Sequence, residues 1–142
     1  MRTCIKAYYG EEAAPYIKEI IDIQTAQVRA TAHAFDFDWH YQAGFYPMNV
    51  AVALDGLWEE ALSADITEEQ LFNVEVANLS WEYFKANQFL GEYFFLNPFR
   101  LQANEKLYDA FLEHGVHRVS AFGLIPQDKS TVDFMLRPFN WK

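Results

Sequence analysis

The stretch DITEEQLFNVEVANLSWEYFKANQFL, residues 65–90, constrains the fold more than any other part of the chain. Thr67 followed three residues later by Gln70 is a capping-box arrangement that starts a helix, and Ile66 can staple onto its first turn. Apolar residues then recur at spacings of three and four, which is typical of one helical face. They are Phe72, Val76, Leu79, Tyr83, Ala86 and Leu90, and Leu71, Val74 and Trp81 widen the face. The pattern predicts a long helix over 67–90 that is buried on a broad face.

Three further stretches carry the same helical spacing. They predict helices over about 12–34, 47–63 and 98–114. Gly56 weakens the second of these helices, and Gly115 ends the third. The predicted inner faces are Ile17, Ile21, Gln24, Val28, Thr31 and Phe35 in the first helix, Val50, Leu54, Leu57 and Ala61 in the second, and Leu101, Asn104, Tyr108 and Phe111 in the third.

The end of the chain has a different character. Residues 116–142 are rich in Val, Phe and Gly and contain two prolines, which favours an extended segment and a tail packed on the helices. The sequence therefore predicts a mainly α fold, a four-helix bundle-like domain with a short extended C-terminal segment. A length of 142 residues without a linker or a low-complexity stretch predicts a single domain over 1–142.

Composition and motifs argue against several classes of function and partner. A net charge of -9 without a basic stripe argues against a nucleic-acid partner. No apolar run approaches the roughly 18 residues of a membrane span, so no membrane partner is expected, and neither is a signal peptide within the chain. The compartment stays open. Cys4 is the single cysteine, so no internal disulfide is possible. Nucleophile-elbow and phosphate-loop motifs are missing, and we predict no cofactor.

The loop over 35–47 is the best candidate for ligand chemistry. Asp36 and Asp38 alternate with aromatic residues, so an extended backbone would direct both carboxylates to one side. Glycoside hydrolysis needs two carboxyl groups about 5 to 9.5 Å apart. Acids in loops are usually only solvated, however, and we predict no catalytic residue and leave open whether the parent protein is an enzyme. Trp39, His40, Tyr41 and Tyr46, together with Phe45, could form a stacking platform for a sugar; the favoured alternative is that they anchor the loop to the core.

The histidines do not predict a metal site. Of His33, His40, His114 and His117, only the last two are close in sequence. Gly115 separates them and ends the preceding helix, so they are not expected to share a helical face. Ordinary surface or hydrogen-bonded histidines are therefore the prediction, and no metal is expected.

Three stretches together resemble a known family. The sequence YYGEEAAPYIKEIIDI, residues 8–23, is similar to the start of the C-terminal helical region in the domain-of-unknown-function 4838 family. This is a bacterial family of glycoside-hydrolase-like proteins, distantly similar to the alpha-glucuronidases. Residues 57–89 resemble a pair of helices in the same region, and residues 100–123 resemble its last helix. The loop over 35–47 and the tail after Pro126 match no pattern of that family.

The resemblance implies a non-catalytic helical accessory domain of a carbohydrate-active enzyme. The family's catalytic barrel and its acids would lie upstream of this chain, and no catalytic residue is carried over. In the related alpha-glucuronidases such a region helps subunits associate. The expected partner is therefore the upstream barrel or a second copy of the chain, with carbohydrate as a further candidate. The alternative is a free-standing ligand-binding module that uses the loop over 35–47.

The aromatic content also points to a partner. Aromatic residues make up 18% of the chain, which exceeds what the inner faces of four helices require. The surplus lies in the loop over 35–46, in the run 93–95 and in the tail. If several of these rings are exposed, they form a patch of the kind that marks a contact site.

Overall fold

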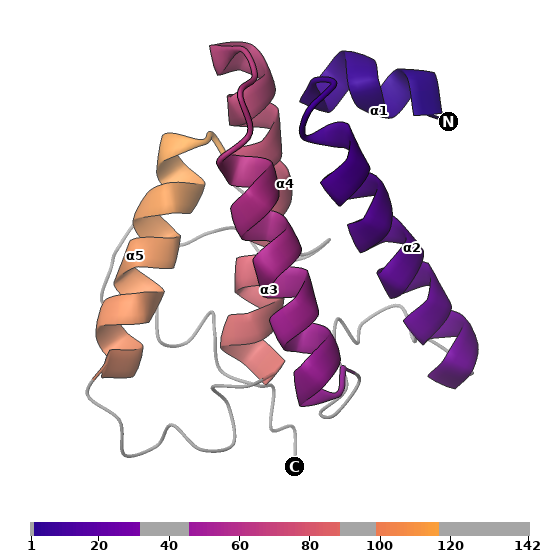
Figure 1. The fold of residues 1–142 in the computed structure, drawn as a ribbon. Helices are drawn as coiled ribbons and strands as arrows, with labels where there is room; N and C mark the ends of the chain where they lie inside the picture. The colour runs from indigo at the N-terminus through magenta and orange to yellow at the C-terminus, as the bar shows by residue number, and fades with distance from the viewer. Residues whose placement is uncertain (1, 32–45, 89–98, 117–142) are drawn as a thin grey trace. The chain divides into compact units, whose positions relative to one another are not determined.

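The computed structural model describes residues 2–31, 46–88 and 99–116, and helices are its only regular elements there. Figure 1 shows the helices in chain order: α1 (Arg2–Tyr9), α2 (Ala14–Thr31), α3 (Met48–Leu62), α4 (Glu68–Gln88) and α5 (Phe99–Glu113). The mainly α prediction is confirmed. The predicted extended segment and tail lie outside the described residues, and so do the last residues of the helices predicted over 12–34 and 67–90.

Helix α1 is the element that the sequence pattern missed. It spans eight residues, which is too short to show a repeated stripe or to be stable alone. Gly10 ends it with a positive φ of 89°, and its N–H donates to the carbonyl of Lys6 at 3.0 Å. This is the left-handed cap that favours glycine. The chain turns at Gly10 between α1 and α2, and we call this turn the α1–α2 elbow.

The described residues belong to two compact units, divided inside α4 between Asn78 and Leu79. The first unit holds α1, α2, α3 and the first half of α4. The second holds the other half of α4 and α5. The division falls within a helix and not in a linker, and the single-domain prediction stays a prediction.

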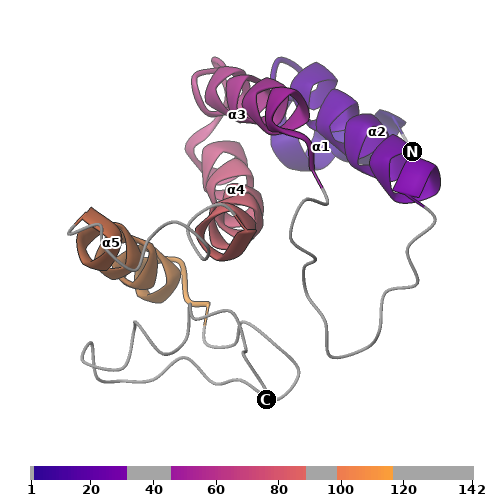
Figure 2. The same cartoon turned by 90° about the horizontal axis from the view of Figure 1, so that it is seen from below.

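Helices α2 and α3 pack together in the first unit and run antiparallel, with α1 lying across the start of α2 (Figures 1 and 2). Ile17 is buried as predicted, but the inner face of α2 is turned by about one position. Ile20 is only 2% exposed, whereas the predicted inner residues Ile21 and Val28 are 37% and 39% exposed. Residues three and four positions after Ile17 both lie on its side of a helix. Packing against α3 buries the residue three positions on, Ile20, and leaves Ile21 partly exposed.

Helix α3 shows the same kind of shift. Leu54 and Ala61 are fully buried, as the spacing predicts. Val50 and Leu57 are only half-buried, and the remaining core positions are taken by Ala51 and Trp58. The face that points inward therefore lies beside the predicted one.

Helix α4 contributes a buried residue to each unit. Val74 is fully buried in the first unit, while Leu79 is buried in the second. These residues are five positions apart, about 140° around the helix axis. Phe72, predicted to face inward, is 47% exposed. A helix with apolar residues on more than one side has no single inner stripe for the sequence pattern to reveal.

The core of the second unit joins α4 to α5. Its buried residues are Leu79, Leu107, Tyr108 and Phe111, and Tyr83, Ala110 and Val116 pack against them. Gly115 ends α5 with φ of 69°, and the N–H of Val116 donates to the Phe111 carbonyl at 2.8 Å. The Gly115 N–H donates to the Leu112 carbonyl at 3.1 Å, which completes a Schellman motif. The prediction that Gly115 ends this helix is confirmed.

Candidate functional site

The residues predicted to bind a ligand lie mostly outside the described residues. Trp39, His40 and Tyr41 belong to the stretch 32–45, as do the carboxylates Asp36 and Asp38. Their proposed roles therefore stay predictions. Of the four predicted ligand residues, only Tyr46 lies in the described part of the chain.

Tyr46 is part of the core. Its side chain is 7% exposed, directly before Pro47 and the start of α3. Burial raises the pKa of its phenol above the ordinary value, because the charged phenolate loses its hydration. A ring that is so deeply buried offers little surface on which a sugar could stack. Its position agrees with the alternative in which the aromatic residues anchor the loop.

A second feature of interest is the contact between the α1–α2 elbow and the start of α4. The predicted capping box is present: the Thr67 N–H donates to Gln70 Oε1 at 3.1 Å, and the Gln70 N–H donates to Thr67 Oγ1 at 3.3 Å. A Cβ atom on Gly10 would lie 2.5 Å from Ile66 Cγ2 and 2.9 Å from Gln70 Oε1. The elbow therefore packs so closely on this capping box that only glycine fits.

Asn73 adds a direct bond between these distant parts of the sequence. Its Nδ2 donates to the main-chain carbonyl of Tyr8 at 2.9 Å. Tyr8 is in the last turn of α1, where carbonyls lack helical partners. The Asn73 side chain thus gives one of these carbonyls a hydrogen-bond donor, and it connects α1 to α4 within the first unit.

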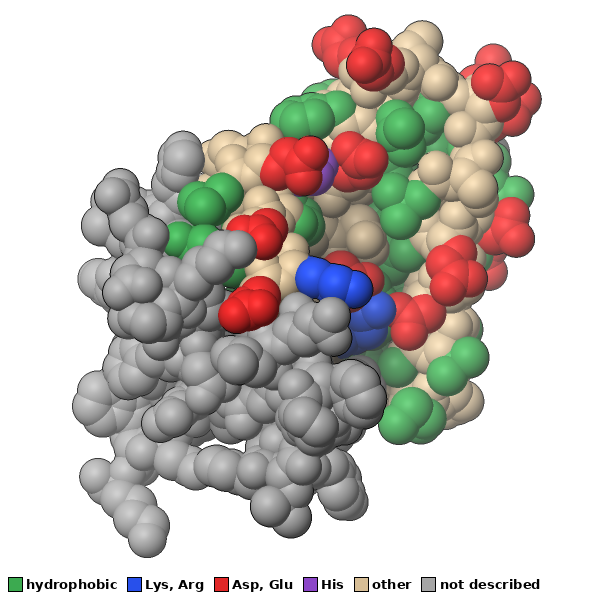
Figure 3. Space-filling view, turned by 90° about the vertical axis from the view of Figure 1, so that its left-hand side faces the viewer, with side chains coloured by type: hydrophobic (Ala, Val, Ile, Leu, Met, Phe, Trp, Pro, Cys, Tyr) green, Lys and Arg blue, Asp and Glu red, His purple; other side chains and the backbone are tan. Residues whose placement is uncertain are grey.

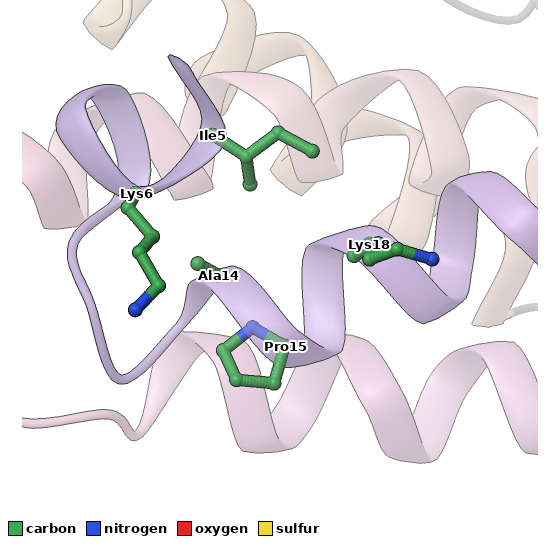
Figure 4. A pocket seen from close by; sticks show the side chains of 5 residues that line it. All are labelled: Ile5, Lys6, Ala14, Pro15 and Lys18. Atoms are coloured by element: carbon green, nitrogen blue, oxygen red, sulfur yellow. The ribbon is translucent and has the colours of Figure 1, made fainter. Parts of the chain in front are cut away.

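A shallow pocket of about 240 Å³ lies between α1 and the start of α2 (Figure 4). Ile5, Ala14 and Pro15 provide its apolar walls, and Lys6 and Lys18 stand at its sides. The apolar spacing of the sequence does not predict this pocket, because Ile5 and Lys6 belong to α1, an element that the spacing did not predict.

The charges beside this pocket are already paired. Lys6 donates to Glu11, and Lys18 donates to Asp22 four residues further along α2. The bond from Lys6 lowers the pKa of the Glu11 carboxyl, since it stabilises the charged form. Both pairs are exposed to solvent, where such ion pairs contribute little. The pocket therefore offers an incoming anion two ammonium groups that carboxylates already neutralise.

Large apolar side chains on the surface form the third feature. The described residues of this kind are Tyr8, Ile21, Val28, Met48, Val52, Phe72 and Leu112. Met48 and Val52 are the most exposed, at 66% and 62%, and they lie one turn apart on α3. Single exposed apolar residues are normal on a protein surface, and these two lie on neighbouring turns of one helix.

On the face of the molecule in Figure 3, acidic side chains of the described residues are interspersed with exposed hydrophobic side chains. His114 Nδ1 lies 2.8 Å from the carbonyl of Ala110, which agrees with a hydrogen-bonded histidine.

Within the described ranges no group of three or more His, Cys, Asp or Glu could hold a metal ion, and no helix could span a membrane. Cys4 is exposed on α1.

Comparison of the chain with protein-family models, curated proteins and solved structures gives no match. The resemblance to the domain-of-unknown-function 4838 family therefore stays a prediction.

Proposed function

We propose that the chain is a helical accessory domain that packs against another protein surface and carries out no chemistry itself. The observation that supports this function best is the exposure of Met48 and Val52 on one side of α3. Both are large apolar side chains, and burying each against a partner would contribute roughly 1 to 3 kcal/mol. Methionine is also enriched where proteins meet, because its flexible side chain adapts to a partner.

The resemblance suggests which protein this domain serves. It would make the parent a glycoside-hydrolase-like enzyme, with its catalytic acids in a barrel outside this chain. The accessory domain would then pack against that barrel or associate two subunits. Carbohydrate would be bound by the parent enzyme.

Binding of a fluorescent dye that reports exposed apolar surface tests the packing role. The full chain should bind the dye at low protein concentration, and the variant Met48→Ser/Val52→Ser should bind much less. Ala53→Ser, an exposed neighbour on α3, is the matched control and should leave dye binding unchanged. Equal dye binding by the double variant and the wild type would contradict the proposed surface.

A second measurement tests the absence of chemistry. The isolated chain should not hydrolyse an aryl glycoside. Hydrolysis that disappears in Asp36→Asn or Asp38→Asn would overturn the accessory role and would make the loop over 35–47 catalytic.

A further inference from the structure

The pocket between α1 and α2 is distinguished by the charges beside it. Residues 4–31 contain only Lys6, Lys18 and Arg29 as bases, and residues 46–78 contain no Lys or Arg. Acidic residues are far more numerous in both ranges. Lys6 and Lys18 nevertheless line the same pocket, one on each side (Figure 4). Two of the few cations in these parts of an acidic chain therefore flank one apolar hollow.

The walls of the pocket suit a small apolar group. Ile5 comes from α1, Ala14 and Pro15 stand at the start of α2, and the space between them measures about 240 Å³ (Figure 4). An apolar cavity of about 150 Å³ can hold benzene. The aliphatic stems of the two lysines extend the apolar surface, while their ammonium groups can stay in water. A single ring or a short alkyl chain would therefore fit, with a polar end directed to solvent.

The carboxylates that pair with the two lysines do not exclude a ligand. Glu11, the partner of Lys6, is 80% exposed, and Asp22, the partner of Lys18, is 61% exposed. Such exposed ion pairs contribute little to stability, because water and salt compete with them. A ligand carboxylate can therefore replace Glu11 on Lys6 while Glu11 returns to water. The ligand gains in addition from the apolar surface that the pocket removes from water.

We propose that the pocket between α1 and α2 binds a small organic anion in which one carboxylate is attached to a ring or a short alkyl chain. The ring or chain packs on Ile5, Ala14 and Pro15. The carboxylate accepts hydrogen bonds from Lys6, and Lys18 adds a second positive charge. This binding site lies apart from the exposed side chains of α3 and does not depend on the proposed packing function.

The test is a titration of the full chain with benzoate, followed by the amide signals in NMR spectra. We expect a dissociation constant on the order of 1 mM, with the largest shifts in residues 5–18. Benzamide has the same ring without the charge, and acetate has the charge without the ring. Each should bind roughly threefold or more weaker than benzoate, and added salt should weaken benzoate binding.

Lys6→Gln should raise the dissociation constant for benzoate roughly fivefold, and Lys18→Gln should raise it less, since its charge is the second one. Arg29→Gln removes the same charge from an exposed position on α2 outside the pocket lining and is the matched control. It should leave benzoate binding unchanged.

Four outcomes would overturn the proposal. The first is the absence of a saturable shift at ten times the expected dissociation constant, and the second is a set of shifts that avoids residues 5–18. The third is equal affinity for benzoate and either benzamide or acetate. The fourth is an effect of Lys6→Gln no larger than that of Arg29→Gln, which would mean that benzoate responds only to the overall charge of the chain.

Discussion

The three described glycines differ in what a methyl group would meet, and this difference is directly testable. At Gly10 a Cβ would collide with Ile66, and φ is 89°. At Gly115 φ is 69° but the space is open, and at Gly56 the backbone is helical and the space is open. Gly10→Ala should therefore cost about 2–4 kcal/mol from strain and overpacking, and Gly115→Ala about 1–2 kcal/mol from strain alone. Gly56→Ala should stabilise by about 0.5–1 kcal/mol. Urea unfolding of the three variants measures this order, and a tolerated alanine at position 10 would contradict the close packing of the elbow.

Because Tyr46 is buried, the free energy of unfolding should depend on pH in the alkaline range. Burial raises its pKa, so folding favours the neutral phenol. The resulting contribution to stability is complete below the unfolded pKa of about 10 and is lost as pH rises through the higher folded value. The urea midpoint should therefore fall above pH 10, and Tyr46→Phe should make this fall less steep. An equal slope in the variant would show that the ring titrates as an exposed phenol does.

At the scale of single elements, α1 is the helix that depends most on distant contacts. Asn73 Nδ2 on α4 bonds the Tyr8 carbonyl, and an isolated helix of eight residues is unstable in water. Asn73→Ala should remove about 1 kcal/mol of local stability and speed amide exchange in α1 roughly fivefold. Asn49→Ala, an exposed asparagine on α3, is the control and should leave α1 unchanged. Unaltered exchange in Asn73→Ala would mean that the elbow alone holds α1 in place.

At the scale of the whole molecule, the question is whether the two units unfold together. Their boundary lies inside α4, and domains are usually separated by exposed linkers. We therefore expect one calorimetric transition, with equal calorimetric and van't Hoff enthalpies. Leu54→Ala in the first unit and Phe111→Ala in the second should each cost about 2–5 kcal/mol and lower the same transition. Two separate transitions, each lowered by only one variant, would replace the single-domain prediction with two domains.

The amino-acid sequence by itself determined the local features of this protein. Thr67 and Gln70 are close in sequence, and their capping box forms from side chains that reach backbone groups three residues away. Gly115 ends α5 for an equally local reason, since glycine adopts the positive φ of the cap without strain. The helix bounds near residues 48, 62, 68, 99 and 113 follow from such signals and from apolar spacing.

Tertiary structure alone decided which side of each helix is buried and whether α1 forms. Ile20 and Ile21 are equally apolar neighbours, and contact with α3 is what buries the first and exposes the second. Such contacts join residues far apart in the chain, so no local spacing encodes them. Tyr46 shows the same limit, because only packing distinguishes an aromatic ring that binds a ligand from one that fills the core.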